Sequence, residues 1–187
     1  MAKKTPAIDY GPIRAALANW ATSVSGLVAI WERPDSRRPP LPYIALNFVT
    51  PSLQPGGFDE LRYDETADEF HTCGQRTAVV SVTTHYCDTD DVESLNMASR
   101  LHAALGADEY LAILNAAGLA VWDQGGIIDI SAELETGFEN RHQIDVTLGL
   151  VSDLVTDPGV IETAEIEATI NEVTGDVAYN ETFIIPE

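Results

Sequence analysis

Basic side chains are scarce in this sequence. Lysine and arginine together number 10 against 30 aspartates and glutamates, which gives a formal net charge of −20. Proteins that grip a nucleic-acid backbone or an anionic lipid surface need clustered Lys and Arg, so this balance argues against both functions. Such an acidic surface suits either a salt-rich host or a protein that must not adhere to DNA, and the composition does not separate the two.

Long apolar runs and cysteine motifs are also lacking. No run approaches the roughly 18–20 apolar residues of a membrane span. The first residues, Met1 to Lys4, have no apolar stretch behind them, so we expect neither a membrane partner nor a secretory signal. Cys73 and Cys87 are the only cysteines, and neither belongs to a CxxC motif. Without a secretory signal, we expect both thiols to stay reduced.

Recognisable catalytic and cofactor motifs are absent from the sequence. There is no Gly-Lys pair for a phosphate loop, no GxSxG and no HExxH. His85, Cys87 and Asp88 resemble a metal group, but no second pair follows at zinc spacing, so we interpret them as an ordinary strand end. We interpret the acids from Asp88 to Glu93 as helix capping rather than a calcium loop. The expectation is no catalytic residue, no cofactor and no metal.

Hydrophobic periodicity predicts the elements of the fold. Helical spacing of apolar residues predicts helices over residues 12–24, 90–105 and 108–117. Alternation of apolar and polar residues predicts strands over residues 27–31, 43–49, 76–87, 128–135, 142–150 and 163–170. The second helix has Asp90 and Glu93 at capping-box spacing. Its expected inner stripe is Leu95, Ala98, Leu101 and Leu105. Strands with one apolar face pack it against helices, so we expect an α+β fold with an antiparallel or mixed sheet and helices on one face.

Two stretches interrupt this periodicity. Residues 51–75 contain Pro55-Gly56-Gly57 and a strongly acidic run, and they are expected to form a long loop or a hairpin. Residues 174–187 have little pattern and are interpreted as a C-terminal tail. The length of 187 residues suits one domain, 1–187, with its core over about residues 10–173.

One segment concentrates positive charge and proline. Residues 33–42 hold Arg33, Arg37, Arg38, Pro39 and Pro40, and four prolines prevent regular strand pairing there. The segment is either a solvated connection or a docking loop for an acidic neighbour, which includes a second copy of this chain.

The predicted late strands carry acids opposite their apolar positions. These acids are Asp129, Glu133, Asp145, Glu165 and Glu167. Burying unpaired carboxylates is costly, so they face water, another subunit or a channel.

Several tracts resemble phage neck or tail terminator proteins. Residues 38–47, RPPLPYIALN, resemble the RP-x-LPY-x-x-L run of that family, and residues 74–82, GQRTAVVSV, resemble its GQR-x-A-x-VSV strand, which includes Arg76. Trp31 before the basic segment and residues 139–146 before the late strand fit as well. The order of elements agrees with the family over residues 10–173, and it departs in the acidic stretch 59–69 and after Val173.

This resemblance implies a structural protein of the virion rather than an enzyme. Members of the family form a ring, usually of six subunits, that caps the head-proximal end of the tail tube. The implied partners are other copies of the chain, the tail tube protein, the head–tail connector or stopper, and genome DNA that passes through the lumen without specific binding. The implied location is the virion neck, assembled in the host cytoplasm. Arg33, Arg37, Arg38, Pro39, Pro40 and Arg76 are the candidate contact residues, and the five acids are the candidate channel residues.

Two other functions remain open from the sequence alone. A head-side adaptor or stopper would have a similar architecture. A small soluble enzyme with its site scattered over several strands would carry no readable motif, but would have a concave pocket lined by titratable groups.

Overall fold

The computed structural model describes residues 7–32, 38–54, 59–67, 69–87, 89–134 and 137–156. The predicted strand over residues 163–170 and the predicted tail over 174–187 lie outside these ranges. Four candidate residues also lie outside them: Arg33, Arg37, Glu165 and Glu167.

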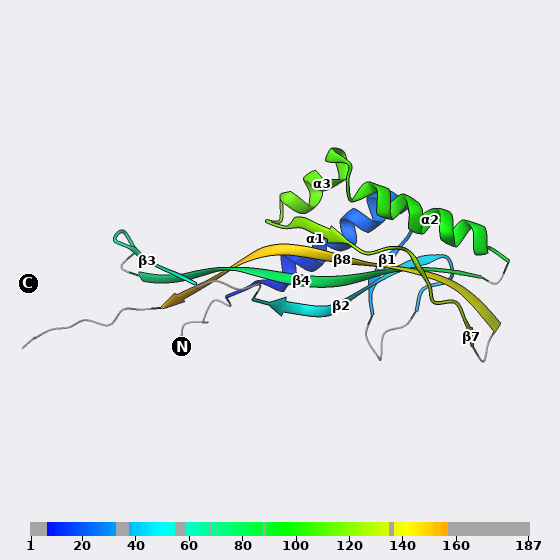
Figure 1. Cartoon of the computed structure of the whole chain (residues 1–187), viewed down its shortest axis with the longest axis horizontal. Helices are drawn as coiled ribbons and strands as arrows, with labels where there is room; N and C mark the ends of the chain where they lie inside the picture. Colours follow the sequence, from blue (N-terminus) through cyan, green and yellow to red (C-terminus); the bar gives the residue numbers. More distant parts are fainter. Residues whose placement is uncertain are drawn as a thin grey trace, which may run out of the picture.

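One mixed sheet forms the centre of the described structure (Figure 1). Its eight strands are β1 (Ala29–Trp31), β2 (Tyr43–Leu53), β3 (Glu60–Asp64), β4 (Glu69–Cys87), β5 (Ala120–Gln124), β6 (Ile128–Asp129), β7 (Ala132–Leu134) and β8 (Gly137–Thr156). The main order is β1-β2-β4-β8-β5, with β3 beside β4 and with β6 and β7 beside β8. β1 is parallel to β2, whereas the remaining pairs are antiparallel, which confirms the expected sheet type.

Two long strands run the whole length of the sheet. β4 and β8 pair from Phe70 opposite Thr156 to Cys87 opposite Glu139. The strands predicted over residues 76–87 and 142–150 are therefore confirmed, but each is only the middle of a longer strand. The extra length comes from residues of mixed polarity that gain backbone partners from the neighbouring strand, a contribution that alternation alone does not reveal.

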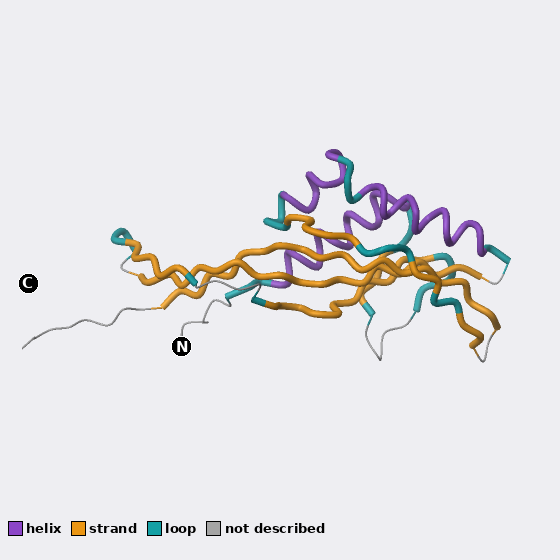
Figure 2. The backbone as a smooth tube through the Cα atoms, viewed as in Figure 1, coloured by secondary structure: helices purple, strands orange, loops and turns teal. Residues whose placement is uncertain are grey.

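Three helices lie on one face of the sheet, as Figures 1 and 2 show. They are α1 (Tyr10–Ser25), α2 (Asp91–Ala104) and α3 (Asp108–Asn115). The α1 helix begins at Asp9, whose carboxylate accepts a hydrogen bond from the Gly11 amide, and ends at Gly26, whose φ of 71° favours glycine. None of the helices in the described part of the chain is long and apolar enough to cross a membrane.

The core lies between these helices and alternate positions of the sheet. Trp20, Leu101 and Leu148 are fully buried members of one apolar cluster drawn from α1, α2 and β8. Trp31 joins this packing at the edge: its ring stacks on Phe48 at 4.8 Å between centroids, and its indole N–H donates to a carbonyl of α1. The apolar side chains at alternate positions of β4 and β8 thus pack against the helices on one face of the sheet.

Residue details differ from the sequence expectation in two places on α2. Leu95 is 45% exposed, because α2 turns Ser94 toward the sheet, where its hydroxyl bonds Thr84 and His142. The stripe that faces the sheet is Ser94, Ala98, Leu101 and Ala104. Asp90 is the residue before α2, but its carboxylate accepts from the Cys87 thiol and makes no side-chain bond to the helix backbone, so the expected capping box does not form.

The strand predicted over residues 128–135 is also wrong in detail. Two short strands, β6 and β7, replace it, and Ile128 and Ile130 are exposed rather than packed. In addition, β5 was not expected as a strand. The physical reason is that all three are edge strands held by the backbone of β8, a tertiary partner that local alternation does not reveal.

The stretch 51–75 is a hairpin where the structure describes it. β2 extends to Leu53, and β3 pairs with the beginning of β4. We call β3, residues 69–75 of β4 and residues 151–156 of β8 the arm. Figure 1 shows the arm extending beyond the part of the sheet that the helices cover.

Candidate functional site

Of the basic segment, residues 38–42 belong to the described structure. The guanidinium of Arg38 is largely exposed, and its Nη1 lies 3.8 Å from Oε2 of Glu139. Pro39 is half-buried and Pro40 is exposed. The two charged groups are 3.8 Å apart and the guanidinium side is exposed, so the pair is weak and Arg38 remains available to a partner.

Arg38 touches the edge of a buried polar cluster at the end of β4. Nδ1 of His85 donates to Oε1 of Glu139 over 2.8 Å, and Nε of Arg141 donates to Oε2 over 2.9 Å. The ring of Tyr43 stacks on His85 with 4.4 Å between centroids. Because the ladder places His85 opposite Arg141 and Cys87 opposite Glu139, these side chains share one face of the sheet.

Burial and charge act in opposite directions on this cluster. Burial lowers the pKa of His85, although Glu139 opposes the shift. Burial alone would raise the pKa of Glu139, but hydrogen bonds from Arg141 and His85 outweigh it and hold that pKa below its ordinary value. The consistent state at neutral pH is a neutral His85 bonded to an ionised Glu139. Nε2 of His85 is buried without a hydrogen-bond partner among the described residues.

Arg76, singled out by the family-like strand, is already paired within the subunit. Its two terminal nitrogens each donate to one carboxylate oxygen of Asp59 over 2.7 Å. This two-point bond lowers the pKa of Asp59 and raises that of Arg76. Arg76 therefore fixes the chain before β3 against β4.

The described channel candidates do not share one face of the sheet. Asp129 pairs with His142 and Glu133 with Phe138, whereas Asp145 pairs with Ser81 on the other face. The reason is the period of two along β8, which sends odd and even positions to opposite faces. The hydroxyl and amide of Ser131 lower the pKa of Asp129, which keeps that carboxylate ionised.

A serine and a histidine also meet under α2. Oγ of Ser94 lies 2.9 Å from Nδ1 of His142 and 3.0 Å from Oγ1 of Thr84. Ser94 is completely buried and His142 nearly so. A catalytic serine must reach a substrate, so this closed trio fits a role in fastening α2 to the sheet.

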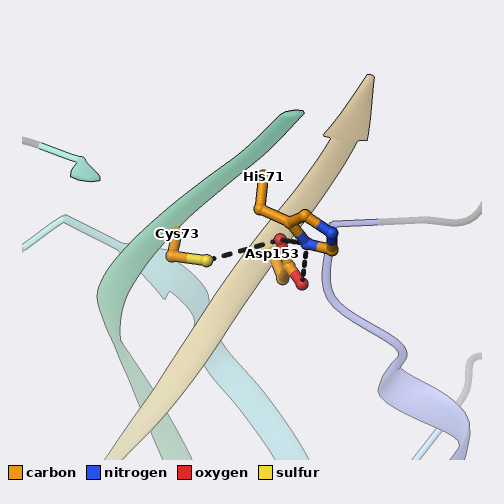
Figure 3. A group of neighbouring side chains, drawn as sticks. All are labelled: His71, Cys73 and Asp153. Carbon is orange, nitrogen blue, oxygen red and sulfur yellow. Dashed lines mark hydrogen bonds and ion pairs between the residues drawn. The ribbon is translucent and has the colours of Figure 1, made fainter. Parts of the chain in front are cut away.

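A second histidine–carboxylate pair lies in the arm, together with a thiol (Figure 3). Nδ1 of His71 is 2.9 and 3.0 Å from the two oxygens of Asp153, and Sγ of Cys73 is 3.5 Å from Oδ1 of the same residue. One donor atom from each of the three residues lies within 4.8 Å of the other two. All three side chains are half-buried.

The same contacts set the electrostatics of this group. The hydrogen bond from His71 lowers the pKa of Asp153. Partial burial raises the pKa of the Cys73 thiol, and Asp153 raises it further. At neutral pH the group therefore holds an ionised carboxylate beside a protonated thiol.

Sequence reasoning missed the group in the arm, although a signal was present. His-x-Cys occurs twice, at His71-Thr72-Cys73 and at His85-Tyr86-Cys87, and both copies lie on β4. On a strand, this spacing places both side chains on one face. The carboxylate comes from β8, which lies far along the chain, so local spacing could not supply it.

Exposed apolar side chains gather at both ends of the long ladder. In the arm, Leu61 is 65% and Leu154 45% exposed, and both flank Thr72 on one face. At the other end Ile128, Ile130 and Phe138 are exposed. Exposed apolar side chains that gather outside the core are typical of surfaces that bind another molecule.

Comparisons with known proteins give one family. A family model described as phage neck terminator protein matches residues 12–176. The comparison with curated proteins found no match. Several solved structures match as well, and one of them has 15% sequence identity and a TM-score of 0.34, covering 78% of this chain and 96% of that chain.

Proposed function

The chain belongs to the phage neck terminator protein family, and on that basis we propose that six copies of it close a ring at the head-proximal end of a phage tail tube. The family makes the chain a structural component of the phage neck. In the proposed ring, the whole chain acts as one subunit, ends the growth of the tube and joins the tail to the head connector. The ring assembles in the host cytoplasm and leaves its lumen open to the genome.

The apolar ends of the sheet support a contact between copies. A ring needs two different complementary surfaces on each subunit, since a self-complementary one closes a dimer instead. The exposed side chains of the arm, Leu61 and Leu154, lie at the opposite end of the β4–β8 ladder from Ile128 and Ile130. Figure 1 shows β3 and β7 at these two ends. We propose that the arm of one subunit packs on the far end of the next.

The basic segment is the proposed contact with an acidic neighbour. Arg33, Arg37 and Arg38 stand out in a chain of net charge −20, and arginine forms two-point bonds with carboxylates. The exposure of Arg38 supports this role, and Pro39 and Pro40 limit the backbone freedom of the residues beside it. Arg76 contributes indirectly, by holding the base of the arm through Asp59.

The lumen is proposed to be lined by carboxylates that leave DNA free to slide. Of the acids described, Asp145 lies on the sheet face opposite the helices, beside the small polar side chains of Ser81 and Thr83. The carboxylate of Asp145 repels phosphates, and Arg141, a cation on the same face, is already paired with Glu139, which supports the use of this face as the channel wall. Asp129 and Glu133, with Glu165 and Glu167, are the remaining candidates for the rim.

Electron microscopy of virions tests the ring. We expect six copies in one ring between the tube and the connector. A location on the head side of that junction would support an adaptor instead, and isolated monomers or twofold dimers in virions would exclude the ring.

Variants that introduce or reverse a charge test the contacts, each beside a control variant. Leu154→Asp in the arm should prevent ring assembly, whereas Leu95→Asp on α2, which is equally exposed in the subunit, should leave the ring intact.

Two further comparisons test the basic segment and the channel wall. Arg38→Glu, alone and with Arg33→Glu and Arg37→Glu, should impair the joining of tail and head more than Arg100→Glu on α2. Asp145→Lys should slow DNA ejection, with Glu109→Lys on α3 as the control. Equal effects of a variant and its control would refute the corresponding contact.

A further inference from the structure

The group in the arm combines three different donor types on rigid strands. His71 and Cys73 are two residues apart on β4, and Asp153 lies directly opposite Cys73 on β8. Cross-strand neighbours on one face have Cβ atoms about 4.5–5.5 Å apart, so the ladder itself fixes the three positions. The amide of Asp153 also donates to the carbonyl of Ala7 over 2.8 Å, which holds β8 from its other side. The backbone that presents these donors is therefore well fixed.

The distances are close to those of a tetrahedral zinc site. With ordinary zinc–ligand bond lengths, donor atoms of such a site lie about 3.4–3.6 Å apart. The distance from Sγ of Cys73 to Oδ1 of Asp153 is 3.5 Å. Nδ1 of His71 lies 3.0 Å from the same oxygen and must move away by only about 0.4 Å, which side-chain rotation supplies. The donor atoms of His71 and Cys73 lie within 4.8 Å of each other.

The chemistry of the donors indicates a borderline-soft divalent cation. One thiolate, one imidazole nitrogen and one carboxylate oxygen form a set that zinc accepts and that magnesium and calcium do not favour. The charged groups on the neighbouring strand β3 are Glu60, opposite Cys73, Arg62, opposite His71, and Asp64, opposite Glu69. Two carboxylates against one guanidinium leave this strand net negative, which adds to the attraction of Asp153 and the thiolate for a cation.

We propose that the arm binds one zinc ion through Nδ1 of His71, Sγ of Cys73 and one oxygen of Asp153, with water as the fourth ligand. Binding releases the thiol proton of Cys73 to solvent and moves the imidazole proton of His71 to Nε2. The ion then joins β4 to β8 in a region without an apolar core, which stiffens the arm. The proposal does not depend on the ring, since a single chain supplies all three ligands.

Cobalt is the probe for the site, because it takes the place of zinc and reports thiolate ligation by a charge-transfer band. Full-length protein freed of metal by a chelator should show this band at one equivalent of Co²⁺ and lose it when Zn²⁺ is added. Cys73→Ser should abolish the band, and Asp153→Asn should weaken cobalt binding at least tenfold. Cys87→Ser is the matched control and should leave the band unchanged, since the Cys87 thiol bonds Asp90 and not a histidine.

A second measurement uses the unaltered chain and needs no variant to fold. Zn²⁺ should protect Cys73 from a thiol-modifying reagent at least tenfold while Cys87 reacts at an unchanged rate. Zn²⁺ should also slow amide exchange in residues 70–74 and 151–155. A chain that shows no cobalt band, a band that survives Cys73→Ser, or equal protection of both cysteines would overturn the proposal.

Discussion

The two ends of strand β4 carry the same short pattern and put it to different uses. At the arm end His71 and Cys73 meet Asp153. At the other end, in the helix-covered part of the sheet that we call the body, His85 bonds Glu139 and Cys87 lies opposite Glu139. In both places a histidine donates to the carboxylate that β8 presents.

The two sites differ in the side chains that surround the carboxylate. Glu139 is buried, and Arg141 takes its second oxygen, while the Cys87 thiol turns to Asp90. No arginine contacts Asp153 in the described part of the chain, so its oxygens remain close to both His71 and Cys73. A histidine and a carboxylate thus join an arginine in a closed ion-pair cluster at one end and join a cysteine in an accessible donor group at the other.

The largest expected contrast concerns two leucines on the same face of β8. Leu148 is fully buried in the body and Leu154 is largely exposed in the arm. Leu148→Ala should lower the free energy of unfolding by about 3 kcal/mol, from lost burial and the cavity left behind. Leu154→Ala should lower it by less than about 1 kcal/mol. Urea denaturation of both variants measures the difference, and equal losses would mean that the arm is packed as the body is.

The two carboxylates should differ almost as strongly. Glu139→Gln leaves Arg141 without its charge partner in a buried site and should cost about 3 kcal/mol. Asp153→Asn removes a partly exposed pair and should cost at most about 1 kcal/mol. Urea midpoints without added metal provide the comparison. A larger loss for Asp153→Asn would reverse the assignment of the closed cluster to the body end.

Two glycines in the ladder allow a finer contrast. A Cβ at Gly149 would meet the ring of Trp122, and one at Gly74 would meet Asp59 and Arg76. Gly149→Ala should therefore cost about 1–3 kcal/mol in global unfolding, through overpacking in the body. Gly74→Ala should instead break the Asp59–Arg76 bond and speed amide exchange of β3, with the body unaffected. Faster exchange throughout the sheet in Gly74→Ala would contradict this separation.

The smallest expected effect is a pH dependence at the body end. The folded-state pKa of His85 lies below its ordinary value because burial disfavours the imidazolium. The unfolded chain therefore binds the proton more readily, so this stability is present above about pH 6.5 and is lost as the pH falls toward the folded pKa. The lowered pKa of Glu139 acts in the same direction below about pH 4.5.

Urea midpoints at pH 7 and pH 5 test this dependence. His85→Gln should flatten the decline over that range, whereas His102→Gln on α2 should keep it. An unchanged slope in His85→Gln would show that the imidazole of His85 is not the group that titrates.

The sequence predicted those features of the fold that depend on residues close together in the chain. Apolar spacing predicted α1, α2, α3 and the middles of β4 and β8, because helix and strand periods are visible in a short window. The family was also readable, since tracts such as residues 74–82 keep their order along the chain. The predictions for Leu95 and Ile128 were wrong, because neither the apolar stripe of a helix nor the alternation of a strand states which neighbour lies opposite.

The amino-acid sequence alone determined the α+β class, the acidic charge and the His-x-Cys spacing of both pairs. Only the tertiary structure decided what each pair became. His71 and Asp153 are 82 positions apart in the chain, and the register of β4 on β8 brings Asp153 to one pair and Glu139 to the other. The β4–β8 pairing is a long-range backbone contact, so the identity and burial of the opposing carboxylate follow from the fold and not from any local pattern.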